Sequence, residues 1–147
     1  MRTFEVCTQV QASVNTIREN FTADLFISLN PPFPPVKLLR FDGNEVGALV
    51  ELELNFLLFK QRWTSRITAA ETTEKSWFFV DEGIQLPFFL GKWQHKHLVE
   101  TANGCTTITD RITLSGPAWL PDILLVMLFK GLMIYRKPVY RRIFGKV

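Results

Sequence analysis

Two stretches of alternating side chains meet at the dipeptide Asn103–Gly104, and they constrain the fold more than any other part of the chain. The first runs over Lys92–Thr101 and the second over Thr106–Ser115. An Asn-Gly pair between two alternating stretches predicts a β-hairpin, because both residues readily adopt the positive φ angles that a tight hairpin turn requires. The chain is therefore expected to contain an antiparallel sheet.

This hairpin carries polar side chains on faces that also carry large apolar groups. Successive side chains of a strand point to opposite faces, so Trp93, His95 and His97 share one face. On the next strand Asp110 shares a face with Ile112. Polar groups in such surroundings need hydrogen-bond partners, or they line a cavity. The pattern predicts a pocket but does not identify its ligand.

The rest of the chain divides into short stretches without repeats, low-complexity tracts or a linker, so residues 1–147 form one domain. Four prolines within Pro31–Pro35 exclude regular structure there and predict a stiff connector or lid. The order of elements predicts an α+β fold, with a curved antiparallel sheet wrapped on a terminal helix. We expect a strand at Thr3–Val10, short helices over Ser13–Asn20 and Phe21–Leu29, strands at Val36–Phe41, Glu45–Leu54, Gln61–Ala70 and Ser76–Glu82, and a final helix from Pro121.

The final helix is predicted to be amphipathic. Its core-facing stripe at helical spacing comprises Ile123, Leu124, Met127, Leu128, Gly131, Ile134 and Tyr135. The basic residues are expected on the solvated side and end of the helix: Arg136, Lys137, Arg141, Arg142 and Lys146. Because Pro121, Asp122 and Lys130 interrupt the apolar run, we expect no stable membrane insertion.

Composition narrows the classes of function. Hydrophobic residues make up 47% of the chain and include 13 Phe, which indicates either a bulky core or aromatic walls around a hollow interior. The net charge of +3 without a basic face interleaved with aromatics argues against nucleic-acid binding. The first residues form a strand rather than an apolar leader, which favours a cytoplasmic protein. Cys7 and Cys105 are then expected to be free thiols.

His95, His97 and Asp110 are the catalytic candidates, because a His–Asp pair can act as a general base. The alternative is a structural network in which Asp110 or Asp81 satisfies each imidazole. No convincing nucleophile accompanies the pair. The candidate ligand-binding residues combine these polar groups with aromatic and flexible side chains: Trp63, Ser65, Asp81, Phe88, Trp93, His95, His97, Asp110 and Met127.

A metal site is a more specific hypothesis for the same residues. His95 and His97 on one strand could supply two imidazoles, with Asp110 as a third ligand. The chain offers no cysteine pair and no further histidine to complete the set, so we predict no metal and no cofactor.

Several segments resemble the SRPBCC proteins in order and spacing. They are Arg62–Ile67, Phe79–Glu82, Leu86–Phe88, Trp93–His97 and Thr109–Arg111. These START-like, helix-grip proteins include polyketide cyclase/dehydrase relatives. The resemblance covers essentially the whole chain and is strongest over Gln61–Leu114. It implies about seven antiparallel strands around a long C-terminal helix, with two short helices after the first strand and a cavity between sheet and helix.

The function implied by the resemblance is binding of a small hydrophobic or amphipathic molecule, such as a lipid, a sterol or a polyketide, in that cavity. One alternative is an enzyme of the cyclase/dehydratase kind that uses a His–Asp pair as general acid/base. The other is a structural or interaction module with a filled core. A continuous cavity of at least about 300 Å³ favours binding or catalysis over a filled core. The sequence leaves the oligomeric state open.

Overall fold

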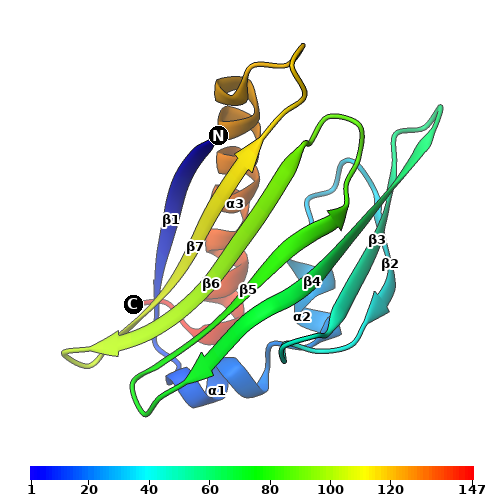
Figure 1. The fold of residues 1–147 in the computed structure, drawn as a ribbon. Helices are drawn as coiled ribbons and strands as arrows, with labels where there is room; N and C mark the ends of the chain where they lie inside the picture. The colour runs from blue at the N-terminus through cyan, green and yellow to red at the C-terminus, as the bar shows by residue number, and fades with distance from the viewer.

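The computed structural model describes residues 1–147 as one seven-stranded antiparallel sheet with a long helix across its concave face (Figure 1). The strand order is β1-β7-β6-β5-β4-β3-β2, so the first strand pairs with the last. The elements are β1 (Arg2–Val10), α1 (Val14–Glu19), α2 (Ala23–Ser28), β2 (Val36–Phe41), β3 (Leu49–Asn55), β4 (Lys60–Thr72), β5 (Ser76–Gln85), β6 (Lys92–Ala102), β7 (Cys105–Ser115) and α3 (Asp122–Phe144).

The predicted hairpin is confirmed. β6 and β7 pair in continuous register from Lys92 opposite Ser115 to Ala102 opposite Cys105. At the turn Asn103 has φ 54° and Gly104 has φ 76°, the left-handed values that a two-residue turn between twisted strands requires. This long, regular pairing fixes which side chains of both strands face the helix.

The predicted early elements are also present. Ser13 caps α1, with its Oγ accepting the backbone N–H of Thr16 at 3.1 Å. One strand starts later than predicted: β3 begins at Leu49 rather than Glu45, because Gly47 has a φ of 92° and bends the chain. Both cysteines are free thiols, as expected.

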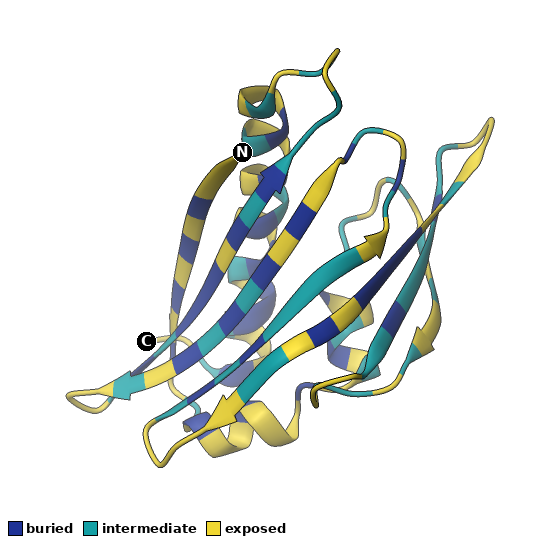
Figure 2. Ribbon diagram, viewed as in Figure 1, coloured by how far each residue is buried: buried dark blue, intermediate teal, exposed yellow.

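Two apolar clusters fill most of the space between the sheet and α3. One lies where α1 and α2 close the lower end and includes Ile17 and Tyr140. The other lies under the N-terminal half of α3 and includes Trp93 and Phe129. Burial alternates along β6, as the period of two requires (Figure 2).

The predicted core face of α3 is wrong. The helix buries Leu125, Phe129, Met133, Arg136, Val139, Tyr140 and Phe144. Six members of the predicted stripe are exposed instead: Ile123, Leu124, Met127, Leu128, Ile134 and Tyr135. Apolar residues occur all around the first half of α3, so periodicity there does not set the rotation of the helix. Val139, Tyr140 and Phe144 in the second half set it, by packing into the first cluster.

Candidate functional site

A cavity of about 310 Å³ lies between the concave face of the sheet and α3. Strands β2 to β6 form its floor, and α2 with the proline-rich segment after it forms one side. Hydrophobic residues supply 19 of the 28 that line it. The polar side chains in the lining are Asn30, Asn44, Ser65, Asp81, His95, His97 and Arg136. A mainly apolar cavity with a few polar groups is typical of sites for small organic molecules.

The central polar feature at the cavity is a cluster of two carboxylates and two imidazoles on β5, β6 and β7, of which Asp81, His95 and His97 line the cavity. In the strand register Asp81 faces His95, and Asp110 faces His97. The short hydrogen bonds run diagonally instead: His95 Nε2 lies 2.8 Å from Asp110 Oδ1, and His97 Nε2 lies 2.9 Å from Asp81 Oδ2. The directly opposed pairs are farther apart, at 3.9 Å and 3.6 Å. Each imidazole is thereby tied to a different strand.

Aromatic contacts hold the imidazoles in these orientations. The rings of His95 and His97 stack with centroids 3.6 Å apart and planes inclined by 28°. Phe79 stacks on the other side of His97 at 4.2 Å, while Trp93 meets His95 edge-on at 5.8 Å. The indole N–H of Trp93 also donates to Asp81 Oδ1 at 3.1 Å. The cluster is therefore held in place by contacts within the sheet.

The terminal helix contributes Arg136 to this cluster, so the prediction that Arg136 lies on the solvated side of the helix is wrong. Arg136 is buried, lines the cavity, and lies with its Nη1 3.6 Å from Asp110 Oδ1. Nη1 has no hydrogen-bond partner. Arg136 lies at helical spacing from Phe129, Met133 and Tyr140, so all four residues share one face of α3. The sequence would identify Arg136 as buried only if the rotation of α3 were known.

Burial and pairing perturb the ionisation of these groups. Burial, with His95 beside it, lowers the pKa of His97 from 6.5 to about 4, despite the hydrogen bond to Asp81. Burial acts to raise the pKa of Asp110, but the hydrogen bond from His95 and the nearby Arg136 outweigh it and bring that pKa to about 2. Burial also acts to raise the pKa of Asp81, but its hydrogen bonds with His97 and Trp93 and the nearby imidazoles together outweigh burial and lower that pKa. Both carboxylates are therefore ionised at neutral pH, and neutral His97 donates its Nε2–H to Asp81.

Most of the predicted site residues come together at the cavity. Trp63, Ser65, Asp81, Trp93, His95 and His97 line it, and Trp63 donates its indole N–H to Ser65 Oγ at 3.1 Å. Asp110 stands behind the imidazoles as their partner and is not part of the lining.

Phe88 and Met127, by contrast, lie outside the cavity and are exposed. Phe89 and Met133 line it instead, because neighbouring loop side chains point in different directions and Met127 is on the outward face of α3.

Asp81, His95 and His97 are also the residues that come nearest to a metal centre, with donor atoms within 4.8 Å of one another. The third member of this group is Asp81 and not Asp110, which was the predicted third ligand. Because the two imidazoles are stacked, their in-plane lone pairs run side by side, whereas a metal ion requires ligands that converge on one point. Both Nε2 atoms are also bonded to carboxylates. The geometry fits a hydrogen-bonded network better than a metal site.

Comparison with known proteins defines the fold. No family model matches the chain. A START superfamily protein from Mycobacterium smegmatis has a TM-score of 0.71 at 11% identity, covering 97% of this chain and 96% of that one. Protein Ms6760 from the same species has a TM-score of 0.68 at 18% identity, over 99% and 91%. The Zhui aromatase/cyclase from a Streptomyces strain has a TM-score of 0.65 at 15% identity, over 97% and 95%.

Together these similarities show that the chain has the START-like helix-grip fold, as the sequence resemblance implied. Among curated proteins, Serpin A11 of Rattus norvegicus is 33% identical over 87 residues, which are 53% of this chain but 20% of that protein. The chain thus matches only a fifth of the serpin's length, and no activity is carried over from it.

Proposed function

We propose that this protein binds a small apolar or amphipathic molecule in the cavity, with an acceptor oxygen of the guest placed against Arg136. One observation carries the proposal: Arg136 is the only Lys or Arg that lines this mainly apolar cavity, and its ion pair with Asp110 is long, at 3.6 Å, and leaves Nη1 without a hydrogen-bond partner. A carboxylate, carbonyl or hydroxyl oxygen of a guest beside the guanidinium would supply a hydrogen bond that this cation lacks.

The imidazoles in the cavity lining favour a role in orienting the guest over a role in catalysis. Both Nε2 atoms are committed to carboxylates, and Nδ1 of His97 is buried 3.6 Å from Asp110. The basic nitrogen of His97 is therefore directed at a carboxylate instead of at the cavity. This favours binding over cyclase/dehydratase catalysis, although one protein of the same fold is an aromatase/cyclase. The cavity volume of about 310 Å³ argues against a filled core.

The test compares two fluorescent probes of similar size, a fatty acid and its uncharged alcohol, titrated into purified protein. Arg136→Met is expected to weaken fatty-acid binding about tenfold or more, because a charge-assisted hydrogen bond is lost, and to affect the alcohol less. Arg142→Met on the exposed part of the same helix is the matched control and leaves both affinities unchanged. Equal loss for the two probes, with both variants folded, refutes the role of Arg136.

A second pair of variants tests the cavity itself. Val50 lines it, so Val50→Phe is expected to lower the affinity for both probes while the protein stays folded. Val46→Phe makes the same change at an exposed loop position and leaves binding intact. Native mass spectrometry of the untreated protein then identifies the class of any molecule that co-purifies. Binding that is unaffected by Val50→Phe contradicts the proposed location.

A further inference from the structure

Large apolar side chains are exposed on three loops at one end of the molecule. They are Leu57, Leu58 and Phe59 in the β3–β4 hairpin, Phe88 between β5 and β6, and Trp119 before α3. Ring contacts bring the three loops together. The ring centroids of Phe59 and Phe88 are 5.8 Å apart, and the ring of Phe88 stacks on Trp119 with centroids 6.2 Å apart. Leu58 is 96% exposed and Trp119 is 65% exposed. All three loops are at the upper end in Figure 1.

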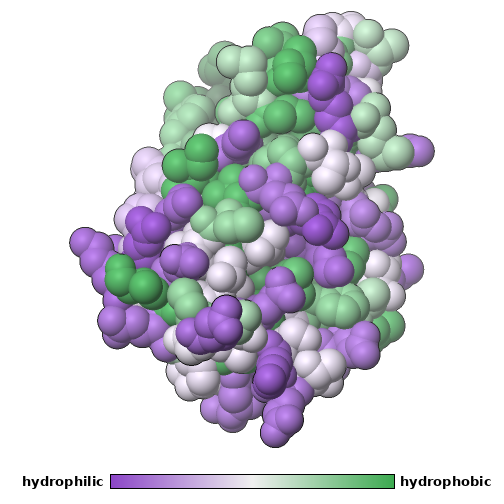
Figure 3. Space-filling model, turned by 90° about the vertical axis from the view of Figure 1, so that its left-hand side faces the viewer, coloured by the Kyte–Doolittle hydropathy of each residue, from purple (hydrophilic) through white to green (hydrophobic).

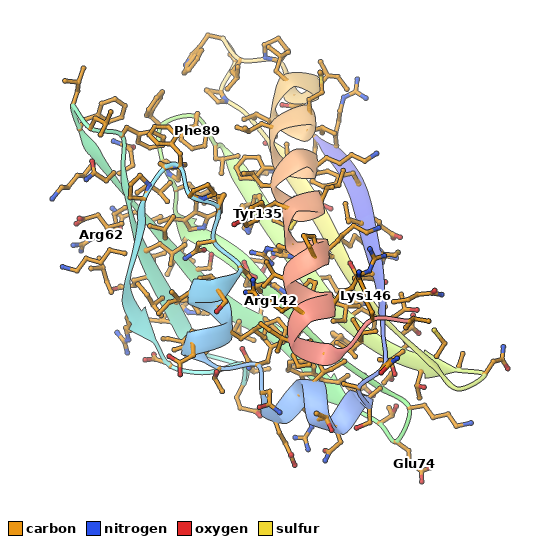
Figure 4. The ribbon with its side chains drawn as sticks, turned by 180° about the vertical axis from the view of Figure 1, so that it is seen from behind. Arg62, Glu74, Phe89, Tyr135, Arg142 and Lys146 are labelled. Carbon is orange, nitrogen blue, oxygen red and sulfur yellow. The ribbon has the colours of Figure 1, made fainter.

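The outward face of α3 continues this surface. Ile123, Leu124, Met127, Ile134 and Tyr135 are exposed along it. Figure 3 shows hydrophobic residues gathered over the upper part of that side of the molecule, and Figure 4 looks onto the helix from behind. We call the exposed loop residues, together with the exposed apolar residues of α3 between Ile123 and Tyr135, the apolar end. A contiguous patch of this kind marks an interaction surface on a folded protein.

Exposed cations lie beside the apolar end: Lys60 in the β3–β4 hairpin, Lys92 at the start of β6 and Lys130 on α3. Glu53, next to the same hairpin, is paired with Lys60 at 3.6 Å. Further along α3, past the apolar end, come Lys137, Arg141 and Arg142, and α3 has no acidic side chain beyond Asp122. Asp122 itself is neutralised by the N-terminal amine at 2.7 Å. Apolar side chains bordered by Lys and Arg are typical of surfaces that bind the headgroup region of an anionic bilayer.

The apolar end is also continuous with the cavity. Leu128 and Phe33 both line the cavity, and both are more than half exposed. Leu128 is on α3 and Phe33 is on the proline-rich segment, so the cavity lining reaches the surface of the molecule at both elements. An apolar molecule that leaves a bilayer at this surface would therefore reach the cavity without crossing water.

We propose that the apolar end docks on the surface of an anionic lipid bilayer, with the cavity opening turned toward the lipid. No helix is long and apolar enough to cross a membrane, so the association is peripheral. A second copy of this chain fits the surface less well, because a two-fold contact would bring the cations of two α3 helices together. Docking does not depend on the proposed function, although entry of a guest from the bilayer does.

The test measures co-sedimentation of the full chain with vesicles of phosphatidylcholine alone and with vesicles that also contain phosphatidylserine. We expect binding that is strengthened by phosphatidylserine and weakened by added salt, since surface charges are screened. Trp63, Trp77 and Trp93 are buried, so a blue shift of tryptophan emission on binding reports Trp119. Trp119→Phe is expected to abolish the blue shift while the chain still sediments with the vesicles.

Leu58→Asp and Met127→Asp, made separately, are each expected to reduce vesicle binding about tenfold or more. The matched control is Val46→Asp, which changes a 62% exposed side chain in the loop before β3 and leaves binding unchanged. Sedimentation velocity without vesicles tests for self-association. A dimer that the same two variants disrupt, no binding to either vesicle, or equal effects of all three variants each overturns the proposal. Probe binding in solution is measured separately, so a failure of docking is distinguishable from a failure of the proposed function.

Discussion

Protonation of His97 is expected to make the protein less stable in mild acid. The unfolded chain takes up this proton at a pKa near 6.5, whereas burial lowers the pKa of His97 in the native protein to about 4. A depressed native pKa contributes stability that is fully present above pH 6.5 and is lost as the pH falls toward about 4. The two pKa values differ by about 2.5, which corresponds to about 3 kcal/mol of unfolding free energy.

The perturbation is His97→Gln. The amide of Gln can still donate to Asp81, but it does not titrate, so the variant lacks this one contribution to the pH dependence. Loss of the stacking between the His97 ring and Phe79 lowers its stability by a similar amount at every pH. All other titrating groups are common to both proteins. The difference in unfolding free energy between them is therefore expected to shrink by about 3 kcal/mol from neutral pH to about pH 4.

The assay is urea unfolding of both proteins at a series of pH values, followed by tryptophan fluorescence. A difference that stays constant across the series would show that His97 has the same pKa in the native and unfolded states. If the protein with His97 instead gains stability relative to the variant as the pH falls, the ion pair with Asp81 raises the pKa of His97 by more than burial lowers it. Either result refutes the reasoning.

Three further predictions concern the same interior. The low pKa of Asp110 contributes stability that is lost as the pH falls from 3.8 to about 2, which amounts to about 2 kcal/mol of unfolding free energy. Asp110→Asn is expected to lack this part of the pH dependence, and acid unfolding curves of both proteins check it. Tyr140→Phe is expected to change the unfolding free energy by less than about 1 kcal/mol or to raise it, because the buried hydroxyl has no hydrogen-bond partner, and a cost of several kcal/mol in urea would reveal one. Ile112→Ala is expected to cost about 3 kcal/mol through the cavity it leaves in the core, whereas Ile84→Ala at an exposed position costs less than about 1 kcal/mol, and thermal unfolding compares the two.

Much of the fold could be predicted because local rules and the tertiary structure agree. The Asn103–Gly104 turn fixes the register of β6 and β7, and the period of two then fixes the faces of both strands. This is why the sequence alone predicts that Trp93, His95 and His97 share one face, which the structure shows to be the inner one. The pairing of β1 with β7 was implied only by the resemblance to SRPBCC proteins, because no local sequence pattern specifies a contact between the first and last strands.

Only the tertiary structure decided which hydrogen bonds the polar cluster makes. Alternation puts Asp81, His95, His97 and Asp110 on the inner face, but the partners are diagonal and not directly opposed. Sheet twist and the stacking of the two imidazoles determine that choice, and both arise from the assembled sheet.

The sequence by itself therefore determined the antiparallel sheet, its inner face and the gathering of imidazoles and carboxylates there, because a strand has a period of two and only two faces. It did not determine the rotation of α3. A helix that is apolar all around has no preferred side until it packs, and packing of Tyr140 and Phe144 turns Arg136 inward and leaves Met127 outside. The single cation in the cavity lining and the exposed apolar face of α3 both follow from that one rotation.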